Sequence, residues 1–148
     1  HGEGLPWRGE KFETLPVGRG RRLREGADVA LLTVGTVGNA AARAAGRAAA
    51  EGVSVAHYDL RFVKPLDEAL LDEVGRKFRR VVTVEDGSLR GGVGEAVTAF
   101  FNARGCEVAV HSLGIGDEWV EHGTPGQLYA LCGYDEEGIL RALLDTRA

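Results

Sequence analysis

The sequence predicts an α/β domain, a three-layer α/β/α arrangement in which helices cover both faces of a mostly parallel sheet. Short apolar runs, of which Val29–Val34 is the clearest, have the composition of strands buried on both faces of a sheet. These runs alternate with segments of helical periodicity, and the connections between them are short. Such alternation indicates βαβ units with right-handed crossovers. We expect about five strands, including an antiparallel strand at one edge.

Composition narrows the class of protein. The chain has 148 residues, of which 44% are hydrophobic and 27% charged, as in an ordinary globular domain. A net charge of −4 disfavours nucleic-acid binding, and no apolar run approaches the roughly 20 residues that cross a bilayer. Cys106 and Cys132 have neither disulfide density nor zinc-site spacing, which favours free thiols. Because the chain begins at His1 and contains no methionine, we expect it to be part of a longer polypeptide.

The first 26 residues differ from the rest. They are rich in turn signals and lack periodicity, so we interpret residues 1–26 as an interdomain linker and residues 27–148 as the domain. Trp7 and Phe12 could contact a neighbouring surface, and Arg21–Arg24 could form a short edge strand. A basic run at Arg19, Arg21, Arg22 and Arg24 could bind phosphates, but a solvated surface is the favoured interpretation.

The first βαβ unit follows directly. After the strand Val29–Val34, Thr36 is expected to cap an alanine-rich helix that continues to about Ala50 and stops at Gly52. The next strand is expected at Val53–Tyr58.

Pro65 and Asp67 define the second helix. Pro65 keeps Lys64 out of helical geometry, so the helix starts after it, and Asp67 is its expected N-cap. Leu70, Leu71, Val74 and Phe78 share its apolar face.

The remaining elements follow at similar intervals. We expect strands at Val81–Val84 and Glu107–His111, with a helix from Gly94 to about Arg104 between them. Thr124-Pro125-Gly126-Gln127 has the pattern of a capping box with proline at the first helical position. Asp135 should cap the last helix.

Ligands of open α/β sheets bind at the carboxyl ends of the strands, so the loops that follow the strands are the candidate sites. Gly35–Gly38 could cradle a phosphate at a helix start, although its glycines lack the spacing of a dinucleotide-binding motif. A tight turn is the favoured interpretation. Glu85 and Asp86 could hold a metal or act as acid and base, but no third ligand or nucleophile accompanies them. We therefore expect them to bind backbone donors and to face a partner domain.

No nucleophile, base and oxyanion hole assemble by pattern, so the sequence predicts contact residues rather than a self-contained active site. Arg61 offers a guanidinium fork suited to a carboxylate across an interface. His122 is interpreted as a loop hydrogen-bonding residue, and His57 and His111 as core or rim residues. The candidates for an interdomain or dimer interface are Asp59, Arg61, Lys64, Glu85, Asp86, Gly91, Gly92 and His122. No catalytic, cofactor-binding or metal-binding residue is assigned.

Several motifs resemble a known family. Asp59-Leu60-Arg61 with Pro65-Leu66-Asp67 resembles the C-terminal domains of transketolase-type enzymes. Arg61–Asp67, Val82–Gly87, Leu113–Ile115 and Glu121–Thr124 narrow the resemblance to 1-deoxy-D-xylulose-5-phosphate synthases, and the match continues through Gly133–Ile139. It covers about residues 26 to 140, and it departs from the family at Gly116, where a proline is usual.

The resemblance implies a thiamine-diphosphate-dependent enzyme that condenses pyruvate with glyceraldehyde 3-phosphate and releases carbon dioxide. It places the diphosphate and Mg²⁺ ligands and the activating glutamate in N-terminal and middle domains, so neither cofactor is expected to bind this chain. The implied partners are those two domains and a second subunit of a homodimer, in the bacterial cytoplasm, with no nucleic acid and no membrane.

Two alternatives stay open. The C-terminal part of a 2-oxoacid dehydrogenase β subunit shares the Asp-Leu-Arg motif. A free-standing nucleotide-binding α/β module would use Gly35–Gly38 for a phosphate.

Overall fold

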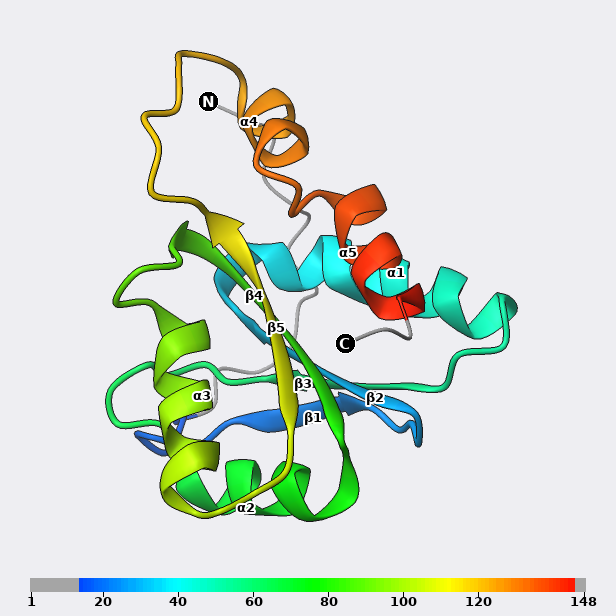
Figure 1. Cartoon of the computed structure of the whole chain (residues 1–148), viewed down its shortest axis with the longest axis vertical. Coiled ribbons are helices and arrows are strands. Elements are labelled where there is room, and N and C mark those ends of the chain that lie inside the picture. Colours follow the sequence, from blue (N-terminus) through cyan, green and yellow to red (C-terminus); the bar gives the residue numbers. More distant parts are fainter. Residues whose placement is uncertain (1–13, 146–148) are drawn as a thin grey trace.

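The computed structural model describes residues 14–145, which form a five-stranded mixed sheet in the order β1-β3-β2-β4-β5 (Figure 1). The outermost strand, β1, pairs antiparallel with β3, and all other neighbours are parallel. The strands are β1 (Arg21–Arg24), β2 (Val29–Val34), β3 (Val55–Asp59), β4 (Arg80–Ser88) and β5 (Ala109–Ile115). This topology confirms the predicted mostly parallel sheet with an antiparallel edge strand.

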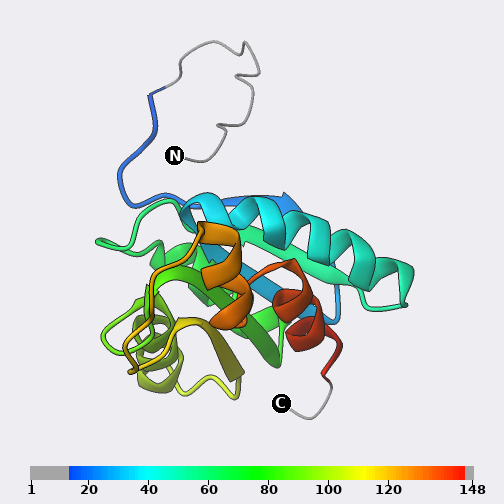
Figure 2. The ribbon, with the colours of Figure 1, turned by 90° about the horizontal axis from the view of Figure 1, so that it is seen from above.

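Helices cover both faces of the sheet (Figure 2). Helices α1 and α5 pack on one face, and α2 and α3 pack on the other. Within residues 14–145, no helix is long and apolar enough to span a bilayer. The helices are the 3₁₀ turn η1 (Gly35–Val37), α1 (Gly38–Ala50), α2 (Glu68–Lys77), α3 (Val93–Ala103), α4 (Pro125–Leu131) and α5 (Glu136–Leu144).

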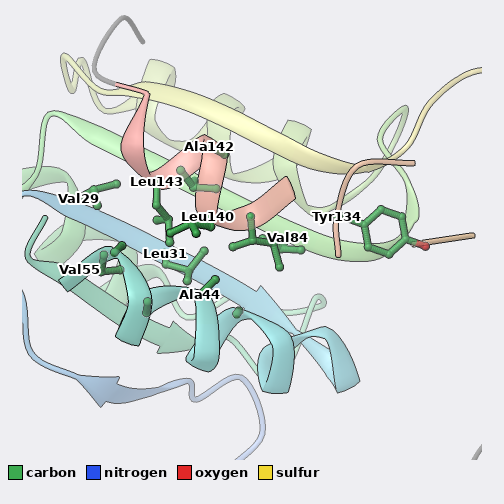
Figure 3. Close-up of a cluster of buried hydrophobic side chains, with 14 of the residues drawn as sticks. Val29, Leu31, Ala44, Val55, Val84, Tyr134, Leu140, Ala142 and Leu143 are labelled. Carbon is green, nitrogen blue, oxygen red and sulfur yellow. The ribbon is translucent and has the colours of Figure 1, made fainter. Parts of the chain in front are cut away.

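Alternation along β2 builds two separate cores. Leu31 faces the core beneath α1 and α5, where it lies with Val84 and Leu140 (Figure 3). Leu32 faces the opposite core beneath α2 and α3. On the first side, the buried face of α1 consists of alanines, so the helix can lie close to the strands: Ala41, Ala44, Ala45 and Ala48.

Three of the expected helix caps are confirmed. Asp67 accepts a hydrogen bond from the Leu70 backbone N–H at 3.1 Å, and Asp135 accepts one from Gly138 at 2.8 Å. Thr124 and Gln127 form the reciprocal capping box at the start of α4. The cap expected from Thr36 is wrong. The chain enters α1 through the 3₁₀ turn η1, which leaves Val37 at the N-cap position without a side-chain cap.

The predicted strand ends also need correction. β4 continues past Val84 to Ser88, because Ser88 still pairs with Ile115 of β5. Glu85 and Asp86 therefore lie within the strand rather than after it. Likewise, β3 begins at Val55 rather than Val53, and β5 spans Ala109–Ile115 rather than residues 107–111.

Arginines fasten the N-terminal segment to the domain. The Asp67 carboxylate accepts hydrogen bonds from the Gly20 backbone N–H at 3.0 Å and from Arg19 at 3.3 Å. Arg21 pairs with Asp59 at 3.1 Å, and Arg22 with Glu73 at 3.3 Å. Three of the four arginines in the basic run thus contact carboxylates of their own domain, which leaves them less available to a phosphate. Trp7 and Phe12 lie outside the described residues.

Candidate functional site

The carboxyl ends of the four parallel strands meet at one edge of the sheet, and they bring most of the candidate residues together. Because β1 is antiparallel, the segment before it reaches the same edge. A groove of about 600 Å³ lies between the ends of β2 and β4 and is lined by Gly35, Val63, Glu85, Asp86 and Gly91, among others. We call this edge the strand-end rim, and it comprises residues 14–20, 35–37, 60–66, 86–92 and 116–123.

Glu85 is buried and holds the start of α3. Its two carboxylate oxygens accept hydrogen bonds of 3.0 Å from the backbone N–H groups of Val93 and Gly94. A negative charge there also complements the positive end of the helix dipole. Both oxygens are occupied within the domain, as the sequence analysis expected for a residue that binds loop backbone donors. This carboxylate therefore fills the place that an anionic ligand would take at α3.

Gly91 and Gly92 give Glu85 its access to the helix. Gly91 has a φ of +73°, which other residues rarely adopt, and its N–H donates to Glu95 at 2.9 Å. A Cβ atom on Gly92 would lie 2.3 Å from the Ser88 carbonyl oxygen and 2.6 Å from both Glu85 carboxylate oxygens. Only glycine fits at position 92.

Asp86 points to the other face of the strand and binds two tyrosines. Its carboxylate accepts hydrogen bonds from the hydroxyl groups of Tyr129 at 2.8 Å and Tyr134 at 2.9 Å. The two rings lie 4.9 Å apart. The hydrogen bond to Asp86 raises the pKa of Tyr129, and burial together with the same carboxylate raises the pKa of Tyr134. Asp86 thereby ties α4 to the sheet.

A second pocket, of about 400 Å³, lies between α4 and the loop after β5. Asp86 and the candidate His122 both line it, together with Val120, Tyr129 and Cys132. His122 itself is exposed. The pocket therefore connects two of the sequence candidates that lie 36 positions apart.

The Asp59-Leu60-Arg61 corner forms a separate group at the end of β3. Asp59 accepts a 3.0 Å hydrogen bond from the Arg61 backbone N–H, and the Arg61 guanidinium lies 3.9 Å from the same carboxylate. Leu60, which lies between them in the chain, is buried, and its backbone N–H donates a 2.8 Å hydrogen bond to the carbonyl oxygen of Thr33. Lys64 is exposed beyond the corner. The corner leads the chain from β3 into residues 60–66 of the rim.

His57 lies in the core, which is one of the two positions expected for it. Its Nε2 lies 2.9 Å from Thr33 Oγ1, and both residues are almost fully buried. Burial lowers the pKa of His57 from 6.5 to about 4, so the ring is neutral at pH 7. His111, by contrast, is exposed on β5.

The donor sets do not fit a metal or phosphate site. Among residues 14–145, no three histidine, cysteine or acidic side chains gather as metal ligands. Glu85 and Asp86 line the groove together with Gly35 and Thr36, and their negative charge opposes a phosphate at Gly35–Gly38.

Sequence reasoning missed two features of the candidate site. Tyr129 and Tyr134 have no local signal, because their partner Asp86 lies more than 40 residues away. Trp119 is fully exposed in the loop after β5, and an apolar residue between the acidic residues Glu118 and Glu121 was its available signal.

Comparison with known proteins shows that the chain is similar to one part of larger proteins. Residues 18–139 match the sequence model of the family described as transketolase, C-terminal domain. The 1-deoxy-D-xylulose-5-phosphate synthase of Bacteroides fragilis is 53% identical over 137 residues, which are 92% of this chain and 21% of that protein. The synthase of Symbiobacterium thermophilum is 42% identical over 130 residues, which are 88% of this chain and 20% of that protein. This chain thus spans about a fifth of the length of these curated relatives.

A solved structure supports the same relationship. A split-gene transketolase, described as an inactive β4 tetramer, superposes with a TM-score of 0.85 and 31% sequence identity. The superposition covers 95% of this chain and 46% of that one.

Proposed function

This chain belongs to the transketolase C-terminal domain family, and on that premise we propose that it is the C-terminal domain of a thiamine-diphosphate-dependent 1-deoxy-D-xylulose-5-phosphate synthase. The observation that carries the proposal is the 53% identity to the Bacteroides fragilis synthase over 92% of this chain. The parent enzyme would condense pyruvate with glyceraldehyde 3-phosphate to 1-deoxy-D-xylulose 5-phosphate and carbon dioxide.

In this proposal the catalytic groups lie elsewhere in the parent polypeptide. Glu85 and Asp86 are the acidic pair at the groove, and each already accepts two hydrogen bonds within the domain. Groups of the domain itself therefore engage both carboxylates, which supports a structural role for the pair. When bound in the parent enzyme, thiamine diphosphate would supply the electron sink for decarboxylation. Isothermal calorimetry of the isolated chain with thiamine diphosphate and Mg²⁺ should show no binding.

The role proposed for this domain is to support assembly through the strand-end rim. Seven large hydrophobic side chains in the described part of the chain are exposed, and five of them lie on this rim. Exposed apolar side chains gathered on one edge are typical of an interaction surface. The five are Leu15, Val17, Val63, Trp119 and Val120.

The sequence candidates divide into two groups on this surface. Arg61, Lys64, Asp86, Gly91 and His122 would contact the neighbouring domain or subunit. Asp59, Glu85 and Gly92 would hold the rim in shape from within, as their hydrogen bonds and close contacts support.

A domain replacement tests the proposal. The test protein is the Bacteroides fragilis synthase in which the region that this chain matches is replaced by this chain, and we call it the Bacteroides fusion. The control is the same enzyme with that region deleted. Product formation from pyruvate and glyceraldehyde 3-phosphate should be restored in the fusion but not in the deletion. A folded fusion that is no more active than the deletion would refute the proposal.

A further inference from the structure

Trp119 is the most exposed large hydrophobic residue in the described part of the chain. Its relative exposure is 102%, against 74% for Val17, the next highest. Tryptophan is seldom left fully in water, and it is enriched among the residues that contribute most to binding at protein interfaces. Within residues 14–145, no other part of the domain covers this side chain.

The loop that carries Trp119 makes contacts on both sides of that residue. Before it, Asp117 pairs with Arg90 at 3.1 Å. After it, the capping box of Thr124 and Gln127 fixes the start of α4, and Val120 lines the pocket beside Tyr129. The loop thus presents Trp119 at the surface between the end of β5 and the start of α4.

Charge identifies the kind of surface that fits this loop. Glu118 and Glu121 flank Trp119 at close spacing, and neither forms an ion pair with another residue of the described range 14–145. Burial of Trp119 would bring both carboxylates to the edge of the interface, where they would need cationic partners. A two-fold contact between copies of this loop would instead bring like charges together.

We propose that Trp119 inserts into an apolar pocket rimmed by arginine or lysine on the remaining part of the synthase polypeptide. The inference rests on the proposed function, because the curated relatives are about five times as long as the region matched, which is 21% of the Bacteroides fragilis enzyme. Trp119 is the anchor of the contact, and Glu118 and Glu121 select for a basic rim.

Tryptophan fluorescence tests the burial of Trp119 directly. In the isolated chain carrying Trp7→Phe, Trp119 is the remaining tryptophan and should emit as an indole in water, with full quenching by acrylamide. In the Bacteroides fusion, the difference between the spectra with and without Trp119→Phe isolates the same residue. That difference spectrum should be shifted to the blue and protected from acrylamide.

Affinity gives the second measurement. The probe is the Bacteroides fragilis synthase that lacks the matched region, titrated with this chain. Trp119→Ala should weaken association at least tenfold, and Glu118→Lys with Glu121→Lys should weaken it severalfold, with the loss reduced at high salt. Trp119→Phe should retain most of the affinity. Leu23→Ala, which removes an exposed apolar side chain on β1, is the matched control and should change affinity less than twofold.

The outcomes separate the two proposals. An active fusion in which Trp119 still emits as in water would overturn the Trp119 pocket while the proposed function stood. An unchanged affinity of the Trp119→Ala variant would also overturn the Trp119 pocket and leave the proposed function standing. A folded but inactive fusion would remove the proposed function, and the Trp119 pocket with it. If the chain and the deleted enzyme do not associate in trans, the spectrum of the fusion decides.

Discussion

The Asp59 carboxylate accepts a 3.0 Å hydrogen bond from the backbone N–H of Arg61, which has a φ of +58°. Arg61 is the one residue other than glycine with a positive φ in the described part of the chain. Such a conformation costs a side-chain-bearing residue on the order of 1 kcal/mol, so the carboxylate stabilises a turn that arginine would otherwise avoid.

The first prediction concerns the coupling of these two residues. Asp59→Ala should lower the free energy of unfolding by about 1 to 3 kcal/mol, since it removes the acceptor and the pair with Arg21. In an Arg61→Gly background the same substitution should cost less, because glycine adopts a positive φ without help. Urea denaturation of the four proteins of the cycle measures the coupling, and additive effects would contradict it.

The second prediction compares two glycines. Gly92→Ala should lower the free energy of unfolding by about 1 to 3 kcal/mol, because its Cβ would clash with the Ser88 carbonyl and the Glu85 carboxylate. Gly46→Ala, on the exposed face of α1 with open space around it, should raise that free energy by about 0.5 to 1 kcal/mol. Thermal unfolding of both variants checks the opposite signs. A tolerated alanine at position 92 would show that the rim can rearrange there.

The third prediction is a pH dependence that comes from His57. Its pKa is lowered in the folded protein from 6.5 to about 4. Between these two pH values the ring therefore binds a proton in the unfolded chain but not in the folded one. The contribution of this pKa shift to the free energy of unfolding is full above pH 6.5 and is lost as the pH falls toward 4. The whole contribution is about 3 kcal/mol. Urea denaturation at a series of pH values should show stability falling by up to this amount.

The control for that measurement is His57→Gln, which cannot titrate but can still hydrogen bond to Thr33. Its stability should be lower at pH 7 and should fall less between pH 6.5 and 4 than that of the unaltered protein. Proton NMR of the His57 ring should give a midpoint near pH 4. A midpoint near 6.5 would rule out the buried neutral ring.

The fourth prediction concerns the tyrosines bound by Asp86. Because the Asp86 carboxylate raises the pKa of both hydroxyls, Asp86→Ala should lower the pKa of Tyr129 toward its ordinary value of 10. Absorbance of tyrosinate in alkaline titration measures the change, and Tyr58, which lies in the opposite core, serves as an internal reference. The stability that these raised pKa values provide is full below pH 10 and is lost as the pH rises above it, so the variant should show less alkaline loss. An unchanged titration would mean that Asp86 does not bind Tyr129 in solution.

Local chemistry explains which features the sequence could predict. The Asp67 and Asp135 caps depend on atoms three residues away, and a capping pattern in the sequence contains both partners. The strand Val29–Val34 was predicted to its ends because it is buried on both faces of the sheet. The end of β4 at Ser88 was not, because it depends on its pairing with Ile115, which is distant in the chain.

The candidate site was harder to predict for the same reason. The sequence placed Glu85 near the glycine-rich helix start, and the structure gives that carboxylate its backbone donors at Val93 and Gly94. The Asp86 contact with Tyr134 spans 48 positions, and no local pattern links those residues. Trp119 was overlooked because an apolar side chain ordinarily indicates burial, whereas here it is exposed.

The antiparallel direction of β1 has a consequence for how the domain could join a longer chain. Because β1 runs against β3, residues 14–20 lie at the strand-end rim, and the Asp67 contacts with Arg19 and Gly20 hold them there. Any domain covalently joined upstream would therefore lie close to the strand-end rim, which is the surface that it is proposed to bind. A short flexible tether gives an effective concentration in the millimolar range, at which even a weak contact stays closed. The rim can then be modest in area and still hold the assembly together.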